Sequence, residues 1–131
     1  MPKHDQKYYL SGPMSGIENF NYPLFEDVTQ CLRVDHGLEV YSPHEIPPPH
    51  QTDMLESKPE EAWSWYMRRA IDMELECDAI ALLPGWPTSR GSRREFDIAL
   101  DLRFELFMVI PGAPKEVARF TQKKYNLVRF A

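Results

Sequence analysis

Cysteine is scarce in this sequence. The 131 residues include two cysteines, Cys31 and Cys77, which are too few for a disulfide framework and do not have the spacing of a metal site. Both stand among apolar residues of helical character. We therefore expect two reduced thiols in the core of a cytoplasmic protein.

Long hydrophobic runs and an excess of positive charge are also missing. No apolar run approaches the roughly 20 residues of a transmembrane helix, and the polar start, MPKHDQK, lacks the apolar stretch of a signal peptide. The 15 Lys+Arg against 20 Asp+Glu give a net charge of −5, whereas proteins that grip nucleic-acid polymers carry a basic surface. We expect neither a membrane nor a polymeric nucleic acid as partner. A small anionic ligand is compatible with the negative net charge, because it needs only a local binding site.

What is present is typical of a folded protein. Hydrophobic residues make up 43% of the sequence and aromatic residues 12%, which excludes disorder as the main state. The length suits one hydrophobic core. There is no repeat and no linker, so we predict a single domain over residues 1–131.

Strand-like and helical segments alternate along the chain. The runs expected to form strands are Lys7–Leu10, Leu38–Tyr41, Ala79–Leu83, Leu106–Ile110 and Asn126–Phe130. The segments expected to form helices are Pro23–Leu32 (ending near Gly37), Glu60–Glu76, Ser92–Phe104 and Val117–Lys124. This alternation predicts an α/β domain, a three-layer sandwich in which helices cover both faces of a five-stranded parallel sheet.

A proline- and histidine-rich stretch, residues 43–59, interrupts this alternation. It is too long for a simple connector, and long loops are often binding loops. His44 and His50 flank its triple proline, but no third ligand has a matching spacing. We interpret the stretch as a solvated loop and expect no metal and no cofactor.

Two loops are the expected ligand site, because ligands of such sheets bind beyond the carboxyl ends of the strands. They are Ser11–Gly16 and Pro84–Gly91, both rich in small residues, and the second leads into a helix start that favours anions. Ser15 and Ser92 are further candidates for contacts with a sugar or a phosphate, although turn chemistry explains Ser15 equally well. Three arginines strengthen the bias towards phosphate: Arg90, Arg93 and Arg94. The spacing matches neither a Walker loop nor GxGxxG.

Glu95 is the candidate reactive group, and it has two interpretations. The tetrapeptide SRRE at residues 92–95 fits a capping box, with Ser92 as the N-cap of the helix. On a helical wheel, however, Glu95 lies on the side of Ala99, opposite the acidic arc of the same helix. A carboxylate that faces inward at the ligand end must be hydrogen-bonded or used, as a nucleophile or a general base.

Three blocks of the sequence resemble the nucleoside 2-deoxyribosyltransferase superfamily. They are YLSGPMSG at residues 9–16, CDAIALLPGW at residues 77–86, and S-x-G-x-x-x-E-x-x-x-A at residues 89–99. Their order and spacing agree with the superfamily over roughly residues 7–110. The most similar branch consists of small, often phage-encoded or bacterial members, and the chain is also similar to the 2′-deoxynucleoside 5′-phosphate N-hydrolases.

The resemblance implies a flavodoxin-like, Rossmann-like fold that cleaves the N-glycosidic bond of deoxynucleosides or their 5′-monophosphates. It implies that Glu95 attacks the anomeric carbon and that Tyr9 holds or polarises this nucleophile. It further implies that Gly12, Ser89 and Gly91 surround the 5′-phosphate. A hydrolase would resolve the deoxyribosyl intermediate with water, and a transferase with a second base. The resemblance also implies a homodimer or larger assembly.

One position departs from the superfamily pattern. Members usually carry an aspartate eight residues before the one that corresponds to Asp78, and this chain has Ala70 there. Asp72 faces elsewhere on the helix, and Glu74 lies one turn farther from the ligand end. A catalytically impaired nucleotide-binding module therefore stays open as an alternative, as does an interaction protein without a substrate. Hydrolysis of a small nucleotide is the expectation, with transfer as the near alternative.

Overall fold

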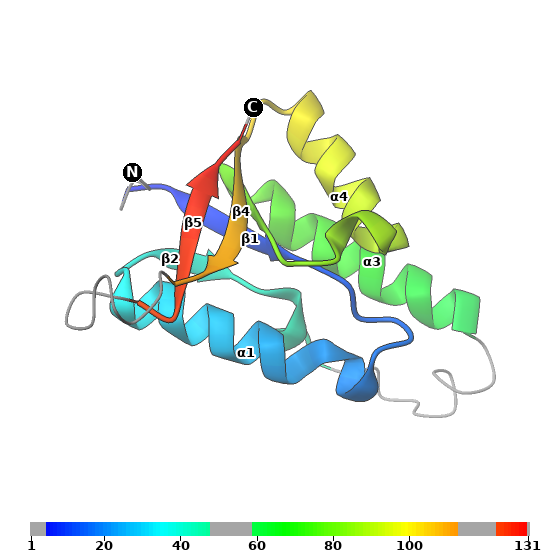
Figure 1. Ribbon diagram of the computed structural model, residues 1–131. Coiled ribbons are helices and arrows are strands. Elements are labelled where there is room, and N and C mark those ends of the chain that lie inside the picture. Colours follow the sequence, from blue (N-terminus) through cyan, green and yellow to red (C-terminus); the bar gives the residue numbers. More distant parts are fainter. Residues whose placement is uncertain (1–4, 48–58, 113–122, 131) are drawn as a thin grey trace.

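The computed structural model, described at residues 5–47, 59–112 and 123–130, has an α/β architecture (Figure 1). Its five strands form one sheet in the order β2-β1-β3-β4-β5. The strands are β1 (Lys7–Ser11), β2 (Glu39–Tyr41), β3 (Ala79–Leu82), β4 (Glu105–Pro111) and β5 (Tyr125–Arg129). The helices are α1 (Tyr22–Gln30, continued by a wider helical turn at Cys31–Asp35), α3 (Pro59–Leu75) and α4 (Arg90–Asp101). All five predicted strands and the first three predicted helices therefore exist.

The last strand corrects the prediction of an entirely parallel sheet. The pairs β1–β2, β1–β3 and β3–β4 are parallel, but β5 pairs with β4 in the antiparallel direction. After β4 the chain turns back beside itself, and the Gly112 N–H donates to the Lys124 carbonyl over 2.9 Å. The predicted helix Val117–Lys124, which would have carried the chain back for a parallel strand, lies outside the described residues except for its last two.

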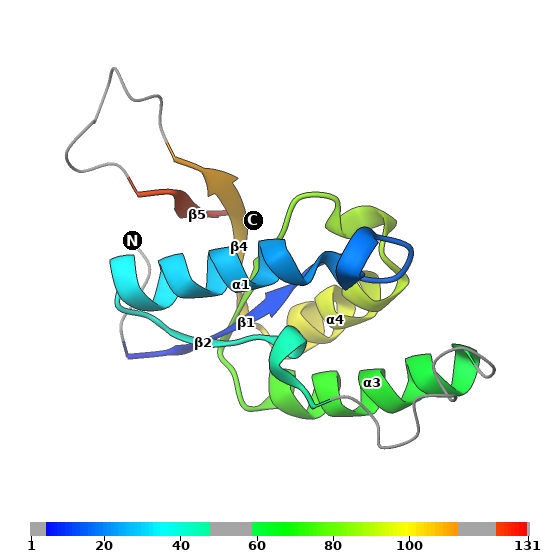
Figure 2. The same cartoon turned by 90° about the horizontal axis from the view of Figure 1, so that it is seen from below.

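Alternation along β1 assigns its side chains to the two faces of the sheet. Tyr8 and Leu10 belong to the core cluster beneath α1, which includes Phe25 and Val28 of that helix. Tyr9 belongs to the cluster on the other face, with Ala70 of α3 and Ala99 of α4. Figure 2 shows α1 on one side of the strands and α3 and α4 on the other.

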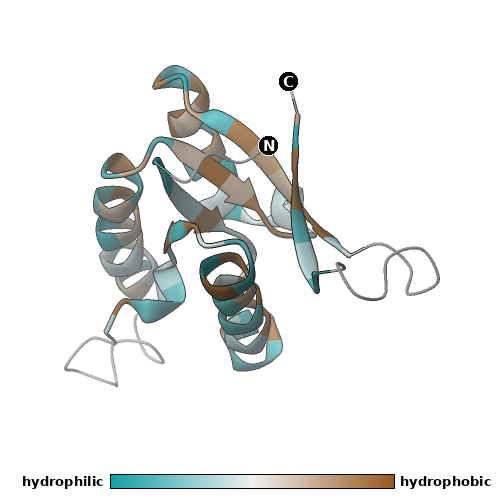
Figure 3. Ribbon diagram, turned by 90° about the vertical axis from the view of Figure 1, so that its left-hand side faces the viewer, coloured by the Kyte–Doolittle hydropathy of each residue, from teal (hydrophilic) through white to brown (hydrophobic). Residues whose placement is uncertain are grey.

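The centre of the sheet is its most apolar part. All four residues of β3 are buried, as is typical of a strand covered on both faces. Figure 3 shows the central strands largely in the hydrophobic colour, between helices that carry hydrophilic residues on their outer surfaces. The helical turn that follows α1 ends at Asp35, shortly before Gly37. Gly37 has a φ of +68°, a conformation that glycine adopts without strain.

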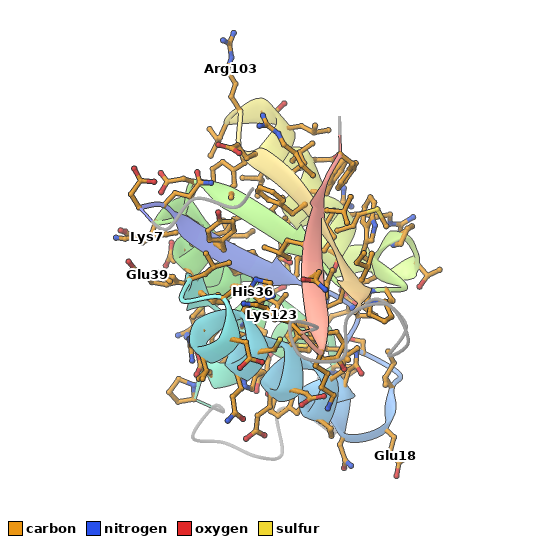
Figure 4. The ribbon with its side chains drawn as sticks, turned by 60° about the vertical axis from the view of Figure 1, so that its left-hand side comes forward. Lys7, Glu18, His36, Glu39, Arg103 and Lys123 are labelled. Carbon is orange, nitrogen blue, oxygen red and sulfur yellow. The ribbon has the colours of Figure 1, made fainter. Side chains whose placement is uncertain are left out.

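The two ends of the sheet differ in what surrounds them. Lys7 and Glu39 come from the amino ends of β1 and β2, where they pair in register, and Figure 4 shows them side by side. Glu18 lies at the far end, beyond the carboxyl end of β1. Between β1 and β3 the order of the strands reverses, so the carboxyl ends of these two strands form the expected ligand position.

The described residues contain neither a membrane-spanning helix nor a cluster of metal ligands. Within residues 5–47, 59–112 and 123–130, no helix combines the length and the apolar character needed to cross a membrane. In the same ranges, no three His, Cys, Asp or Glu side chains gather as metal ligands would. His44 contacts the Ser42 hydroxyl through Nδ1, while His50 lies outside the described residues.

We predict that Gly12→Ala destabilises the fold, because a Cβ at this position would lie 2.7 Å from Cβ and Cδ1 of Leu83. Leu83 is fully buried and cannot move away without disturbing the core. The expected loss is about 1–3 kcal/mol in the free energy of unfolding, measured with urea. Gly91→Ala is the control, since its nearest neighbour is the flexible Met67 thioether at 3.2 Å. Equal stability of the two variants would contradict the prediction.

Candidate active site

Glu95 lies in the second turn of α4, with its side chain towards the sheet and 5% of its surface exposed. The N-cap of this helix is Ser89, whose hydroxyl accepts a hydrogen bond from the Ser92 N–H over 3.2 Å. The capping-box interpretation of residues 92–95 is therefore wrong. The helix begins one turn earlier than that motif requires, which leaves the Glu95 carboxylate for other partners.

Those partners come from β1. The Tyr9 hydroxyl donates to Glu95 Oε2 over 2.6 Å, and the Ser11 hydroxyl donates to Oε1 over 2.7 Å. Ser11 Oγ is also hydrogen-bonded to Ser92 Oγ at 3.0 Å. Because a hydroxyl has one hydrogen, Ser92 is the donor in that bond when Ser11 donates to Glu95. Each carboxylate oxygen of Glu95 thus has a fixed donor, and both donors are fully buried.

Burial and hydrogen bonding act on the Glu95 carboxyl in opposite directions. Burial disfavours the charged form and is the larger effect, while the bonds from Tyr9 and Ser11 favour it. The result is a pKa of about 7 for Glu95, against an ordinary value of 4.5. A carboxyl that changes charge near neutral pH and has its oxygens held in place suits a nucleophile or a general base.

The Tyr9 hydroxyl is held in its neutral form. Burial raises the pKa of Tyr9 well above 10, and the charge of Glu95 raises it further. Tyr9 therefore acts as a hydrogen-bond donor to Glu95 and does not itself ionise near neutral pH. The sequence placed Glu95 and Tyr9 in one site, and the structure brings them into direct contact.

Ser11 is a site residue that the sequence analysis missed. It was assigned to the loop after the first strand, whereas it is the last residue of β1. Alternate residues of a strand share a face, so the position of Tyr9 predicts the orientation of Ser11. Extending the strand by one residue would have found it. Ser15, selected instead, is exposed, and its side chain lies outside the hydrogen-bonded group around Glu95.

The two predicted ligand loops lie against each other. A Cβ on Gly85 would be 3.6 Å from Cγ of Pro13, which places residues 84–91 beside residues 11–16. Gly12 packs on Leu83 and Gly91 faces Met67, so both glycines also serve the packing of the chain. The predicted phosphate residues therefore share the carboxyl end of the sheet.

The three arginines of the second loop have different surroundings. The Arg90 guanidinium lies 3.7 Å above the Trp63 ring and forms an ion pair with Glu60 at 3.0 Å, both from α3. Arg93 and Arg94 are exposed on the first turns of α4. Arg90 thus joins α4 to α3.

A second buried carboxyl, Glu74 of α3, was set aside by the sequence analysis. Its side chain is fully buried, and neither carboxylate oxygen has a hydrogen-bond partner among the residues that the structure describes. Burial, followed by the charge of Glu95, raises the pKa of Glu74 to about 9. Glu74 is therefore a neutral acid at neutral pH. Ala70, which replaces the aspartate of the superfamily pattern, is 5% exposed and packs in the apolar cluster with Tyr9.

Two surface cavities lie away from this group. One, of about 500 Å³, is lined by β2 together with Arg33, Glu45 and Met73. The other, of about 460 Å³, runs along the outer surface of α3 beside Trp65 and Arg69. Glu95 and Tyr9 line neither of them.

Comparisons with known proteins agree with this architecture. Residues 6–108 match a domain family of unknown function, DUF4406. The chain resembles the 2-deoxyribosyltransferase of Bacillus psychrosaccharolyticus with a TM-score of 0.56 and 19% identity, over 78% of this chain and 70% of that one. It also resembles a conserved protein from Enterococcus faecalis V583, with a TM-score of 0.52 and 18% identity, over 78% of this chain and 61% of that one. No curated protein has a significantly similar sequence. At these identities the likeness establishes a Rossmann-like α/β fold.

We predict that Tyr9→Phe raises the pKa of Glu95 above its value of about 7, because the lost hydrogen bond favours the charged form. The expected increase is about one pKa unit, measured by ¹³C NMR of the glutamate carboxyls during a pH titration. The control is Tyr8→Phe, which removes a hydroxyl from the opposite face of the sheet. An unchanged or lower Glu95 pKa in Tyr9→Phe would show that the hydrogen bond from Tyr9 does not stabilise the charged form of Glu95.

We also predict how stability depends on pH. Glu74 and Glu95 both have folded-state pKa values above the ordinary 4.5, so the folded state retains protons that the unfolded state releases. The contribution of these two carboxyls to the free energy of unfolding therefore falls as the pH rises from about 4.5 towards 9. Replacing Glu74 by glutamine removes the contribution of Glu74 to this pH dependence, which is up to about 1.4 kcal/mol per pH unit.

The measurement is urea unfolding of wild type and Glu74→Gln between pH 5 and pH 8. The stability of the variant relative to wild type should rise with pH. Asp72→Asn removes an exposed carboxylate from the same helix and should leave the pH dependence unchanged. Parallel curves for wild type and Glu74→Gln would mean that Glu74 is ionised in the folded protein.

Proposed function

This chain belongs to the DUF4406 family, and we propose that it cleaves the N-glycosidic bond of 2′-deoxyribonucleoside 5′-monophosphates. The observation that carries the proposal is the Glu95 carboxylate, buried at the carboxyl ends of β1 and β3 and held by Tyr9 and Ser11. Parallel sheets bind ligands at this position. A hydrogen-bonded carboxylate there matches the need of an oxocarbenium-like centre for a nearby negative charge.

The proposed reaction has two steps. In the first, ionised Glu95 attacks the anomeric carbon, and the base departs with its bonding electrons and takes up a proton. In the second, water attacks the anomeric carbon of the resulting deoxyribosyl ester, the bond to Glu95 breaks, and the carboxylate is restored as a proton is released. Tyr9 and Ser11 each donate to one oxygen of Glu95, so they fix the direction from which the carboxylate meets the sugar.

A phosphate on the substrate is supported by the two loops beside the reactive group. Gly12, Ser89 and Gly91 are proposed to surround it, with Ser15 and Ser92 as further polar neighbours. Ser89 lies at the N-terminus of α4, where backbone N–H groups and the helix dipole favour an anion. Exposed basic side chains follow on the first turns of the same helix: Arg93 and Arg94.

Deoxyribosyl transfer is the second candidate function. It is favoured by the structural likeness to a protein named as a 2-deoxyribosyltransferase. The two reactions share the first step and differ in what resolves the ester, water or a second base. Product formation that requires an added base would identify a transferase. Nucleotide binding without base release would identify the impaired module suggested by Ala70.

We further propose that the protein acts on its small-molecule substrate in the cytoplasm, as a single domain in a homodimer or larger assembly, without a cofactor. The outer surface of α3 is the proposed contact between copies. Its half-buried aromatic residues are already covered in part by arginines, with Arg69 at 3.8 Å above the Trp65 ring.

The proposal is tested by incubating the protein with each deoxynucleoside 5′-monophosphate and separating free base by chromatography. Glu95→Gln keeps the shape of the side chain but loses the nucleophile, so base release should fall at least about 10³-fold. Asp97→Asn, an exposed carboxylate on the same helix, is the matched control and should retain full activity. Equal rates for wild type and Glu95→Gln would remove Glu95 from the reaction.

A further inference from the structure

β5 is the last strand of the sheet, and its outer edge is open. On its inner side β5 pairs with β4, and no further strand follows it in the order of the sheet. In Figure 2, β5 stands at the border of the ribbon, beside β4. An open edge presents backbone N–H and C=O groups that pair readily with another strand, so proteins usually cover such edges or place charges and prolines along them. β5, with the sequence YNLVR, has no proline and one charged residue.

The hydrogen bonds between β4 and β5 determine which backbone groups point outward. The Phe130 N–H donates to the Leu106 carbonyl over 3.0 Å, so these two residues form a hydrogen-bonded pair. In an antiparallel ladder, such pairs alternate with pairs that exchange no hydrogen bond. The register of the two strands therefore turns the backbone groups of Val128 and Asn126 towards β4 as well. The remaining residues of β5 direct their N–H and C=O groups away from the sheet: Tyr125, Leu127 and Arg129.

One of these three residues is already occupied. The Tyr125 N–H donates to Cys31 Sγ over 3.4 Å, and the Tyr125 carbonyl accepts from the Cys31 thiol at 3.6 Å and from His36 Nε2 at 2.7 Å. In the described part of the chain, no group pairs with the outward N–H and C=O of Leu127 or Arg129. The open edge therefore consists of these two residues, and the turn that follows α1 closes it at Tyr125.

Two open residues on either side of Val128 define one way for β5 to pair with a copy of itself. In an antiparallel pair with its two-fold axis at Val128, Leu127 faces Arg129 of the second copy, and all outward groups of both residues gain partners. An axis at Leu127 would set Arg129 against the occupied Tyr125. An axis at Arg129 would place two guanidinium side chains directly opposite each other, which is unfavourable.

Exposed apolar side chains lie beside the same axis. Met108 and Ile110 of β4 and Val128 of β5 are 38%, 37% and 45% exposed. Alternation along β4 and the pairing with β5 place them on the face of the sheet that carries Leu106, and α4 leaves them uncovered. With the axis at Val128, the two copies of this side chain meet in a non-hydrogen-bonded pair, where side chains are closest. The apolar strip then continues from one copy to the other.

The charges near the axis do not oppose this pairing. Arg129 is the charged residue of β5, and it lies on the other face of the sheet, that of α1. Its guanidinium is 3.5 Å from the Glu105 carboxylate of the same chain. In the paired strands Arg129 stands opposite Leu127 of the second copy, so its apolar stem can cover that side chain while its charge stays beside Glu105.

We propose that two copies of this chain associate through β5, antiparallel around a two-fold axis at Val128, and so form one continuous sheet. A second copy fits this edge because the symmetry matches both the open backbone groups and the apolar strip at once, whereas a strand of another protein would match the backbone groups alone. The contact is separate from the outer surface of α3, and it does not depend on the activity proposed for Glu95.

The test measures the molar mass of the particle in solution by light scattering, for wild type, Val128→Lys and Val128→Glu. Each variant alone places two like charges on the axis, so the mass should fall to half of the wild-type value. An equimolar mixture places lysine opposite glutamate and should recover the wild-type mass. Leu100→Lys is the matched control, because Leu100 is 48% exposed on α4, away from the edge. It should keep the wild-type mass.

Val128→Cys tests the position of the axis without adding a charge. A non-hydrogen-bonded antiparallel pair brings its two Cα atoms within the range of a disulfide, so mild oxidation should join two chains covalently. Met108→Cys, which is on the same face but one strand farther from the axis, should stay unlinked on a denaturing gel.

Three results would overturn the proposal. The first is a wild type that is monomeric at every protein concentration, which would leave the edge to a strand of another protein. The second is a wild-type mass for Val128→Lys, or a mixture of the two charged variants that stays at half the mass. The third is a covalent dimer of Met108→Cys but none of Val128→Cys. None of these results bears on base release, so the proposed function is tested separately.

Discussion

The hydrogen-bonded contact between the Glu95 carboxylate and the hydroxyls of Tyr9 and Ser11 is the interaction on which this account depends. It joins α4 to β1 across the core and fixes a carboxyl where the order of the strands reverses. Burial favours the neutral acid and the two donors favour the carboxylate, and their balance leaves a pKa of about 7. A carboxyl in this condition is available in its charged form at neutral pH without being stabilised so far that it becomes a weak nucleophile.

The same arrangement weakens the fold. Two carboxyls, Glu74 of α3 and Glu95 of α4, are buried, and within the described part of the chain Glu74 has no hydrogen-bond partner. Apolar packing has to offset this, and it does so on both faces: Tyr8, Leu10 and Phe25 are fully buried beneath α1, while Ile80 and Ala99 are fully buried beside the carboxyls. Stability is reduced at the site because the reaction proposed for it requires charge inside the protein.

Hydrophobic periodicity and the Gly-Ser-Pro loops were enough to predict the first four strands, the three described helices and the inward face of Glu95. They could not predict the antiparallel β5, because the direction of a strand depends on where the preceding connection leads. The sequence suggested Ser92 as the N-cap of α4, whereas the structure has Ser89 there; both serines satisfy the local pattern, so the pattern alone does not distinguish them. Ser11 was missed because the first strand was predicted to end at Leu10, one residue too early. Glu74 was placed one turn from the ligand end, but its lack of a hydrogen-bond partner among the described residues depends on the surrounding side chains, which periodicity does not describe.

The central claim is that Glu95 forms a covalent bond with the deoxyribosyl group. Acid quenching of a reaction during turnover, followed by proteolysis and mass spectrometry of the peptides, tests it most directly. The account predicts a deoxyribose phosphate adduct on the peptide that contains Glu95, which disappears as the substrate is consumed. Base release without an adduct at any time, or an adduct on a different side chain, would contradict it.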